Sequence, residues 1–130
     1  MNASVDSAAR AAESRALGKW AEEAVVRYLE EAGAQIVATN LRLGRLELDI
    51  VAREGRVVLV VEVRARGPGA WTRGFGSLGT AKRLRIRRAA ERLWNRRYLH
   101  DPSVDRLRID AASVTLANGQ AIVEYVKAAF

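Results

Sequence analysis

The amino-acid sequence predicts an α/β domain in which a mixed β-sheet is flanked by helices. Two stretches with apolar residues at helical spacing, about 14–32 and 80–98, alternate with strand-like runs. The predicted order is one helix, three strands, a second helix and two strands. With 130 residues, 49% of them hydrophobic, the chain has enough apolar side chains for a core and is not a disordered polycation. We expect one domain at 14–130 behind a flexible N-terminal tail at 1–13.

The first helix and the first three strands follow from apolar spacing. Leu17, Ala24 and Tyr28 belong to an apolar stripe of the first helix, and Gly33 follows it as a stop. Strand-like runs then occupy about 35–40, 46–52 and 57–65. Between the last two lies the tetrapeptide 53–56, in which we expect Glu54-Gly55 to form a two-residue hairpin turn.

The second half of the chain begins with a glycine-rich stretch at 67–79, expected to be a mobile loop or one that becomes ordered on binding. Thr80 is the expected cap of the second helix, which has Ile86, Ala90 and Trp94 in its buried stripe. Two further strands at about 107–116 and 120–126 are joined by a turn at 117–119.

Composition excludes several classes of site. The chain has no cysteine, which excludes a disulfide framework, a thiolate zinc site and a cysteine nucleophile. His100 is the only histidine, so a bound metal must sit mainly on carboxylates. The longest apolar run, 57–61, is far short of the about 20 residues that span a bilayer. Residues 1–14 do not resemble a secretory signal, so we expect a cytoplasmic protein with no membrane partner.

The net charge of +7 belongs to one segment, 82–97, whose sequence contains eight basic residues and one acid. The basic residues are Lys82, Arg83, Arg85, Arg87, Arg88, Arg92, Arg96 and Arg97. The rest of the chain has 14 basic and 14 acidic residues and is neutral. Such a stripe attracts polyanions, and arginine favours phosphate because its guanidinium donates paired hydrogen bonds. A solvated helix face that keeps the protein soluble is the alternative interpretation.

Acidic residues gather on the hairpin between 46 and 65. With the turn given above, Asp49 faces Val60, and Glu47 faces Glu62. One face of the hairpin then carries Glu47, Asp49, Glu62 and Arg64. The other face carries only apolar residues, namely Leu46, Leu48, Ile50, Leu59, Val61 and Val63.

This acidic face predicts a metal-dependent site. Asp49 and Glu62 are diagonal neighbours in that register, and crowded carboxylates are costly unless a cation offsets them. Mg²⁺ or Mn²⁺ is the expected cofactor, since hard cations prefer carboxylate oxygens and water, and such an ion assists phosphodiester hydrolysis. Arg64 points to the same place and is suited to holding phosphate or water, and Glu22 or Glu23 is a candidate further ligand. The alternative is an ordinary exposed strand face with cross-strand ion pairs.

The glycine-rich stretch contributes further candidate binding residues. Trp71, Arg73 and Phe75 combine aromatic and basic groups suited to gripping a strand or stacking on bases. An aromatic pair that closes over the core is the alternative interpretation.

These residues together resemble the uncharacterised YraN-like proteins of bacteria, over about 16–130. The matching residues are Gly18, Ala21-Glu22, Tyr28-Leu29, Asn40-Leu41-Arg42, Glu47-Leu48-Asp49, Val61 to Arg66, Phe75-Gly76, Lys82, Arg108-Ile109-Asp110 and Ala128-Ala129-Phe130. The resemblance implies a restriction-endonuclease-like fold similar to that of archaeal Holliday junction resolvases.

The resemblance also implies roles for individual residues. It implies that Asp49 and Glu62 bind the metal, and Glu22 corresponds to the first-helix glutamate of resolvase-like sites. The lysine that usually closes the third-strand motif is Arg64 in this chain, and the glycine expected before Glu47 is Leu46. Arginine keeps the positive charge but lacks the compact ammonium that such nucleases use to orient water.

The leading hypothesis is a nucleic-acid-binding protein, with a Mg²⁺-dependent endonuclease acting on branched or structured DNA as its candidate activity. Asp49, Glu62, Arg64 and Glu47 are its candidate catalytic residues, and Glu22 is a further candidate metal ligand. The remaining nucleic-acid-binding candidates are Arg66, Trp71, Arg73, Phe75, Lys82, Arg85, Arg88 and Arg92. The rivals are a binding module of the same fold that does not cut and a protein–protein adaptor that uses the basic helix. A homodimer stays open, because resolvase-like proteins often act as dimers.

Overall fold

The computed structural model describes residues 3–66 and 79–130 of the chain. Their elements are α1 (Ala3–Glu31), β1 (Gln35–Leu43), β2 (Leu46–Glu54), β3 (Val57–Arg66), α2 (Thr80–Leu93), the short π-helical segment η2 (Trp94–Tyr98), β4 (Arg106–Ala117) and β5 (Gln120–Val126). This order confirms the predicted sequence of one helix, three strands, a second helix and two strands.

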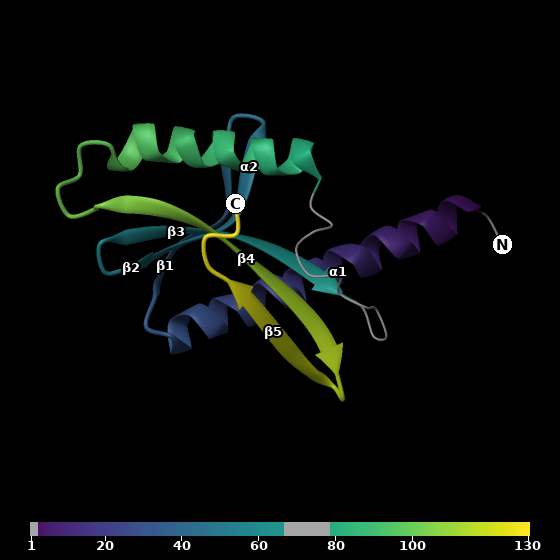
Figure 1. Cartoon of the computed structure of the whole chain (residues 1–130). Helices are drawn as coiled ribbons and strands as arrows, with labels where there is room; N and C mark the ends of the chain where they lie inside the picture. The colour runs from purple at the N-terminus through teal and green to yellow at the C-terminus, as the bar shows by residue number, and fades with distance from the viewer. Residues whose placement is uncertain (1–2, 67–78) are drawn as a thin grey trace.

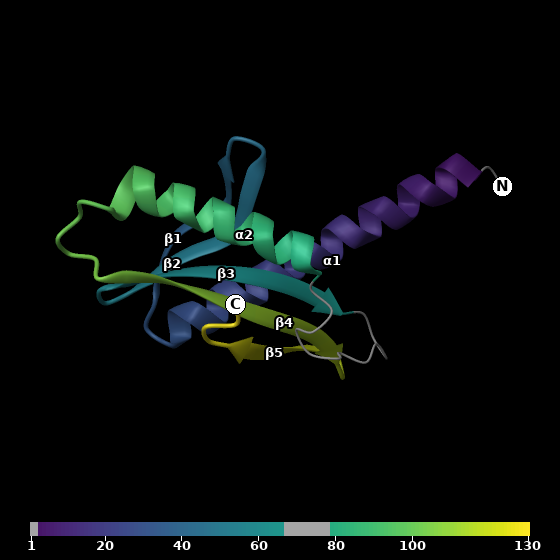
Figure 2. The same cartoon turned by 45° about the horizontal axis from the view of Figure 1, so that its top comes forward.

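The strands form one mixed five-stranded sheet in the order β1-β2-β3-β4-β5. Every neighbouring pair is antiparallel except β3 and β4, which run parallel and are connected through α2. Figures 1 and 2 show α1 on one face of the sheet and α2 on the other. The predicted fold class, an α/β domain consistent with a restriction-endonuclease-like core, is therefore confirmed.

Each helix buries its own face of the sheet. Against α1 lies a cluster that includes Val25, Ile50 and Val61, and against α2 lies one that includes Leu93 and Val60. Because β3 lies in the middle of the sheet, both of its faces are covered at Val58 to Val61, which explains its unbroken apolar run.

The first helix is longer than its apolar pattern indicates. It begins at Ala3, so the expected start at about Ser14 is wrong. The added turns are rich in alanine, the strongest helix former, but residues 7–16 are exposed and have no apolar stripe to bury. In Figures 1 and 2 this part of α1 extends past the edge of the sheet. The flexibility of the segment 1–13 stays a prediction.

The hairpin turn between β2 and β3 lies one residue later than expected. Glu54 pairs with Val57, so the turn is Gly55-Arg56 rather than Glu54-Gly55. Gly55 has a φ of +59°, and glycine is favoured at the first central position of a hairpin turn because it tolerates a positive φ. The register therefore shifts by two residues, which changes the residues that face each other but does not by itself move a side chain to the other face.

The predicted apolar face of the hairpin is only partly correct. Ile50 and Val61 pack toward α1, but Leu46 and Leu48 pack in the cluster around α2. Pairing between β2 and β3 stops at Ile50, and the first part of β2 pairs only with β1. Figure 1 shows the β1–β2 hairpin leaving the plane of the sheet and rising beside α2, which explains the change of side.

The second helix also starts differently from the prediction. Gly79 occupies the N-cap position in an extended conformation, and Thr80 is the first helical residue, so Thr80 is not the cap. The Gly79 carbonyl accepts a hydrogen bond from the Arg83 N–H at 3.1 Å. The helical path continues from Leu93 through η2 to Tyr98, close to the predicted end.

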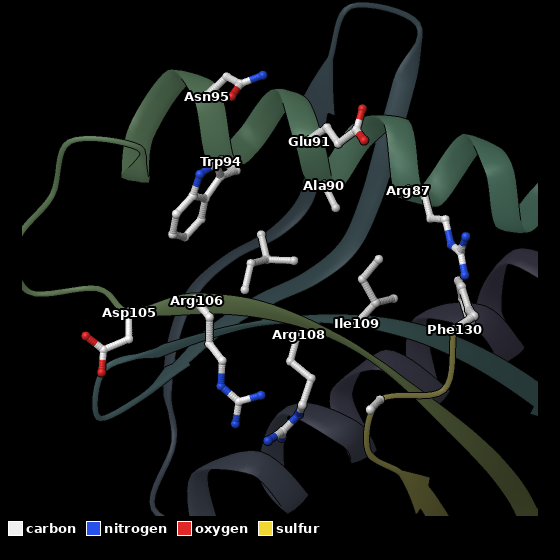
Figure 3. Close-up of a pocket in the computed structure, with 12 residues that line it drawn as sticks. Arg87, Ala90, Glu91, Trp94, Asn95, Asp105, Arg106, Arg108, Ile109 and Phe130 are labelled. Atoms are coloured by element: carbon white, nitrogen blue, oxygen red, sulfur yellow. The ribbon is translucent and has the colours of Figure 1, made fainter.

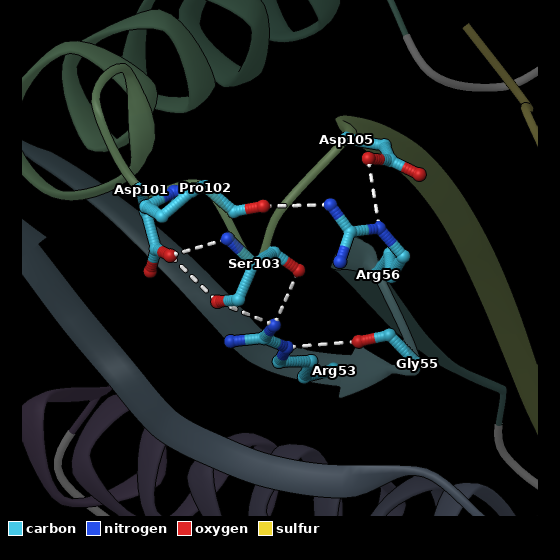
Figure 4. A network of polar contacts seen from close by, with 7 residues as sticks. All are labelled: Arg53, Gly55, Arg56, Asp101, Pro102, Ser103 and Asp105. Atoms are coloured by element: carbon cyan, nitrogen blue, oxygen red, sulfur yellow. Dashed lines mark hydrogen bonds and ion pairs between the residues drawn. The ribbon is translucent and has the colours of Figure 1, made fainter.

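Two arginines near the β2–β3 turn clamp it to the loop before β4 (Figure 4). Arg53 Nη2 donates to the Ser103 carbonyl at 2.7 Å and to its hydroxyl at 2.9 Å. Arg56 Nε lies 2.9 Å from Asp105 Oδ1, and Arg56 Nη2 donates to the Pro102 carbonyl. Asp101 accepts hydrogen bonds from Ser103 and fixes the same loop.

Among residues 3–66 and 79–130, no helix is both long enough and apolar enough to cross a membrane.

Candidate functional site

Asp49 lies at the point where β2 separates from β3. The last pair between these strands is Ile50 with Val61, so Asp49 and Glu62 occupy the next positions along the ladder. Asp49 Oδ2 accepts a hydrogen bond from the Val63 N–H at 2.9 Å. The carboxylate thus satisfies a strand N–H at the end of the ladder, and the two acids are direct neighbours rather than the predicted diagonal ones.

Glu62 is buried, with 5% of its surface exposed, and faces α2. Its Oε1 atom lies 2.9 Å from Lys82 Nζ in the first turns of that helix. A carboxylate so covered needs a nearby cation or hydrogen-bond donors. Lys82 supplies the cation, so this residue belongs to the acidic site, although the sequence predicted only a phosphate contact for it.

The acid pair is strained electrostatically. Burial, and then the negative charge of Glu62, raise the pKa of Asp49 to about 7. The hydrogen bond from the Val63 N–H and the charge of Lys82 oppose the rise but do not cancel it. Asp49 therefore gains a proton near neutral pH, and a cation placed beside it would favour its charged form.

Glu22 approaches Asp49 from α1, on the other side of the sheet. Its pKa is raised by burial and then by the charge of Asp49, and a hydrogen bond with the Asn40 side chain opposes the rise. Asn40 has a φ of +49°, a left-handed conformation that asparagine adopts more readily than most residues. Glu22 Oε1 is buried without a hydrogen-bond partner among the described residues. Glu22 and Asp49 line one hollow of about 130 Å³.

The acids do not form one compact ligand set. Within 3–66 and 79–130, no three carboxylate or imidazole side chains come close enough together to hold a metal ion. Glu47 lies at the rim, where Arg42 Nε is 3.7 Å from its Oε2 atom in an exposed pair. A hollow of about 230 Å³ opens between the hairpin and α2. This acidic hollow is lined by Arg45, Leu46, Glu47, Asp49, Glu62, Lys82, Arg85 and Ile86.

The donors present suit Mg²⁺ or Mn²⁺ in one arrangement. Mg²⁺ is commonly held by one or two carboxylates, with water and substrate phosphate as its other ligands. Asp49 and Glu62 are two adjacent carboxylates of this kind, and burial together with the charge of Glu62 raises the pKa of Asp49. Glu22 offers an oxygen behind Asp49 that has no hydrogen-bond partner among the described residues.

Arg64 and Arg66 follow Glu62 on β3. Alternation along a strand puts their side chains on the same face as Glu62, as the sequence predicted. Both are half-buried, and both engage neighbouring groups. The positive charge that the sequence assigned to Arg64 is thus on the face of the acids, although the cation paired with Glu62 is Lys82.

The arginines of α2 lie on different sides of the helix. Arg85 lines the acidic hollow, and Arg88 is exposed one turn farther along. Arg92 Nη1 donates to the Leu43 carbonyl at 3.1 Å and thereby holds the β1–β2 hairpin against α2. Of the predicted nucleic-acid-binding residues, Arg92 therefore also has a structural role. Trp71, Arg73 and Phe75 lie outside the described residues.

Sequence reasoning missed two residues of the site. Arg45 lines the acidic hollow from the tip of the β1–β2 hairpin, and Asn40 is the hydrogen-bond partner of Glu22. The signal for Asn40 was its place in a strand-like run, where asparagine is uncommon and needs a local reason. No local signal identified Arg45, because its place depends on the folding of the hairpin toward α2.

Fold and site define an α/β protein with a five-stranded mixed sheet, a buried carboxylate pair at a fork between strands, and an arginine-rich helix beside it. Residues 21–114 match the family described as "Uncharacterised protein family UPF0102". The chain belongs to this family, and the resemblance to YraN-like proteins is confirmed.

Several members of the family are similar over most of the chain. A UPF0102 protein of Sorangium cellulosum is 53% identical over 117 residues, covering 89% of this chain and 81% of that protein. One from Nocardia farcinica is 37% identical and covers 94% of both chains. One from Syntrophotalea carbinolica is 37% identical over 88% of this chain and 90% of its own.

Proposed function

We propose that this protein binds nucleic acid and, with Mg²⁺ or Mn²⁺, hydrolyses phosphodiester bonds in branched or otherwise structured DNA. The observation that carries the proposal is the convergence of Asp49, Glu62 and Lys82 in one hollow that Arg45 and Arg85 also line. Carboxylates for a cation and guanidinium groups for phosphate are the two requirements of such a site.

Binding rests on the basic surface of α2. Exposed arginines at 85, 87 and 88 follow one another along the helix, and the hairpin tip adds Arg45. Such a surface neutralises backbone phosphates and releases their counterions, so its affinity falls steeply with salt. The surface begins at the acidic hollow, which would bring a bound phosphate close to the carboxylates.

Each residue of the hollow has a role suited to its chemistry. Asp49 and Glu62 are the ligands of the cation, and Glu22 supports Asp49 from the α1 side. The chemistry that a divalent cation supplies when bound is acidification of water and neutralisation of phosphate charge. Lys82 provides the compact ammonium that Arg64 lacks, since its Nζ already lies at Glu62. Arg64 contributes positive charge on the same face of β3, and Glu47 assists from the rim.

A second candidate function is nucleic-acid binding without cleavage. The 2.9 Å ion pair between Lys82 and Glu62 favours it, because a carboxylate held by lysine is already compensated. In that case binding would depend on the α2 arginines and would not respond to chelators.

A cleavage assay separates the two functions. The purified full chain is incubated with four-way junction, flap and single-stranded DNA in Mg²⁺ or Mn²⁺, with and without chelator. Cleavage that requires the cation supports the nuclease. Salt-dependent binding without cleavage of any substrate supports the binding module, and a complex with an acidic protein that excess DNA does not displace supports the adaptor.

We expect the double variant Arg85→Ala/Arg88→Ala to bind DNA about tenfold more weakly or worse, because it neutralises fewer phosphates and so releases fewer counterions. The slope of log affinity against log salt concentration should fall by about 2. Fluorescence anisotropy at several salt concentrations measures both quantities. Arg10→Ala/Arg15→Ala, which removes the same charge from exposed positions on α1, is the matched control. Equal losses in the two variants would contradict a specific α2 surface.

We expect Lys82→Ala to slow cleavage at saturating DNA by about a hundredfold, the size of effect typical of a single charged donor in an active site. Its DNA affinity should change much less. Single-turnover cleavage and equilibrium binding measure the two effects, with the exposed Lys127→Ala as control. An unchanged cleavage rate with weaker DNA binding would instead support the predicted role of Lys82 as a phosphate contact.

A further inference from the structure

The two flanks of α2 carry different charges. On one flank Arg87 and Glu91 lie one turn apart at the rim of an apolar hollow of about 570 Å³, which opens between the helix and the beginning of β4 (Figure 3). Their opposite charges offset each other. Glu91 is the only acid of α2, so the opposite flank, which faces the β1–β2 hairpin, has no acid of the helix beside Arg85 and Arg92.

The β1–β2 hairpin ends in the two-residue turn Gly44-Arg45, between the paired residues Leu43 and Leu46. Gly44 has a φ of +68°, which glycine tolerates at the first central position of such a turn. Both leucines pack in the cluster around α2. The turn thereby places Arg45 on the hairpin wall of the acidic hollow, while Arg85 lines the same hollow from α2.

Arg92 holds the tip of the hairpin in this position. Its Nη1 atom donates to the Leu43 carbonyl at 3.1 Å, and the same atom would lie 3.1 Å from a Cβ added at Gly44. The guanidinium therefore lies against the turn itself, next to the residue that reaches the hollow. Arg45 and Arg85 have like charges and repel each other, so this hydrogen bond and the packing of Leu43 oppose a separation of the hairpin from α2.

The two arginines of the hollow are suited to a shared anion. Arg45 and Arg85 are both exposed, and neither has an ion-pair partner within residues 3–66 and 79–130. A guanidinium donates paired hydrogen bonds to phosphate oxygens, and a phosphate between two such groups would offset their mutual repulsion.

We propose that Arg45 and Arg85 bind one backbone phosphate of nucleic acid from opposite walls of the acidic hollow, and that Arg92 is the positioning residue that keeps Arg45 there. The proposal rests on the phosphate binding of the proposed function. It adds a second wall, the hairpin, to the surface of α2, and it assigns to Arg92 a role through Arg45 rather than a phosphate contact of its own.

The first test removes the hairpin guanidinium. Arg45→Ala should bind four-way junction DNA about tenfold more weakly, and the slope of log affinity against log salt concentration should fall by about 1. Fluorescence anisotropy of the full chain, in chelator so that no DNA is cut, measures both quantities. Arg15→Ala, which removes an exposed charge from α1, is the control and should change neither. Wild-type affinity and slope in Arg45→Ala would overturn the proposal.

A double-mutant cycle tests the role of Arg92. Arg92→Leu should weaken binding in the wild type but cause little further loss in Arg45→Ala, because both changes remove the same phosphate contact. Arg87→Leu takes the same charge from the other flank of α2, and its effect should add to that of Arg45→Ala. Equal further losses from Arg92→Leu and Arg87→Leu in Arg45→Ala would show that Arg92 acts through its own charge and would overturn its positioning role.

A pair of glycine variants tests the same role without removing a charge. A methyl group at Gly44 requires Arg92 Nη1 to move by a few tenths of an ångström, away from a hydrogen bond that is already 3.1 Å long. Gly44→Ala should therefore weaken DNA binding about threefold and lower its salt slope towards that of Arg45→Ala.

Gly55→Ala is the matched control for Gly44→Ala. Gly55 occupies the same position of the β2–β3 turn with a φ of +59°, and a methyl group there meets nothing within 4 Å. Both variants should lower Tm to a similar extent, because alanine is strained at a positive φ. Only Gly44→Ala should change the salt slope, which a loss of stability alone does not alter. Equal slopes in the two variants would overturn the positioning role of Arg92.

The outcomes separate this proposal from the proposed function. A wild type that binds and cleaves DNA, with both activities unchanged in Arg45→Ala, would overturn the hairpin wall and leave the proposed function intact. Binding that depends on Arg45 without cleavage of any substrate would support the hairpin wall and contradict the nuclease. A wild type that binds no DNA would overturn both.

Discussion

The Asp49→Asn variant is expected to cleave branched DNA about a thousandfold more slowly than the wild type, which corresponds to about 4 kcal/mol of lost transition-state stabilisation. Asparagine has nearly the same shape as aspartate but cannot supply the negative charge that a divalent cation needs. Its amide oxygen can still accept the hydrogen bond from the Val63 N–H. DNA binding should therefore be kept, and single-turnover cleavage under Mg²⁺ measures the loss.

The same substitution should make the protein more stable, by about 1 kcal/mol or a few degrees in Tm. Burial raises the pKa of Asp49 most, and electrostatic repulsion from the neighbouring Glu62 raises it further. Asparagine removes that repulsion. Functional carboxylates commonly carry such a cost, whereas a structural ion pair does not.

The matched control is Glu124→Gln, an exposed carboxylate on β5 that should change neither quantity. Glu62→Gln should also abolish cleavage, but it leaves Lys82 without its partner. Cleavage by Asp49→Asn at the wild-type rate would contradict the proposed nuclease activity. An absence of cleavage by the wild type as well as by both variants would also contradict it. A loss of stability in Asp49→Asn would show that the carboxylate is part of the fold rather than of a site.

Asp110→Asn is expected to destabilise the protein by about 3 kcal/mol, because it leaves a largely buried arginine without its counter-ion. Asp110 is fully buried, and both of its oxygens accept hydrogen bonds from Arg108, at 2.8 and 2.9 Å. The Tyr125 hydroxyl donates to Oδ2 at 2.6 Å, and the Ala128 N–H donates to Oδ1 at 2.9 Å. Urea unfolding of variant and wild type measures the difference.

The effect of Asp110 should depend on pH in a defined direction. Burial by itself would raise the pKa of Asp110, but the hydrogen bonds from Arg108, Tyr125 and Ala128 outweigh it and hold the pKa below the ordinary value of 3.8. The stabilisation is therefore complete at neutral pH and is lost as the pH falls through the folded-state pKa. The difference in the free energy of unfolding between the wild type and Asp110→Asn should become smaller at acidic pH.

Asp105→Asn is the control for Asp110→Asn. It breaks the exposed ion pair with Arg56, which should cost less than about 1 kcal/mol. A similar loss of unfolding free energy in the two variants would contradict the assigned role of Asp110. So would a difference between Asp110→Asn and the wild type that stays constant down to low pH.

Apolar spacing was enough to predict the order of the elements, because each element buries one face and that requirement is local. It was not enough for the start of α1, because residues 7–16 are exposed without an apolar stripe and their alanines favour a helix through propensity. It also misplaced the β2–β3 turn, although the preference of glycine for the first central turn position would have identified Gly55-Arg56.

The candidate site was predictable in part. The faces of Asp49 and Glu62 follow from strand alternation, which a shift of two residues leaves unchanged. The cluster into which Leu46 and Leu48 pack does not follow from strand alternation, because it depends on the point at which β2 separates from β3. The contact of Lys82 with Glu62 depends on where the first turns of α2 lie over β3, which no local pattern contains.

Asp110 shows a further limit. Its only sequence signals were its match to YraN-like proteins and its position as a single acid in a strand of mostly apolar residues. The three groups that donate to it come from β4, β5 and the tail, so its role becomes visible only when these segments are brought together.

The clamp around Arg53 and Arg56 has a consequence for the order of folding. It joins residues about 50 positions apart, as in Arg53 with Ser103, whereas β1, β2 and β3 are connected by tight hairpins. Local hairpins form before contacts that must close a long loop. We therefore expect the three antiparallel strands to assemble before β4 joins the sheet. The parallel alignment of β4 with β3 is then fixed when the clamp contacts form.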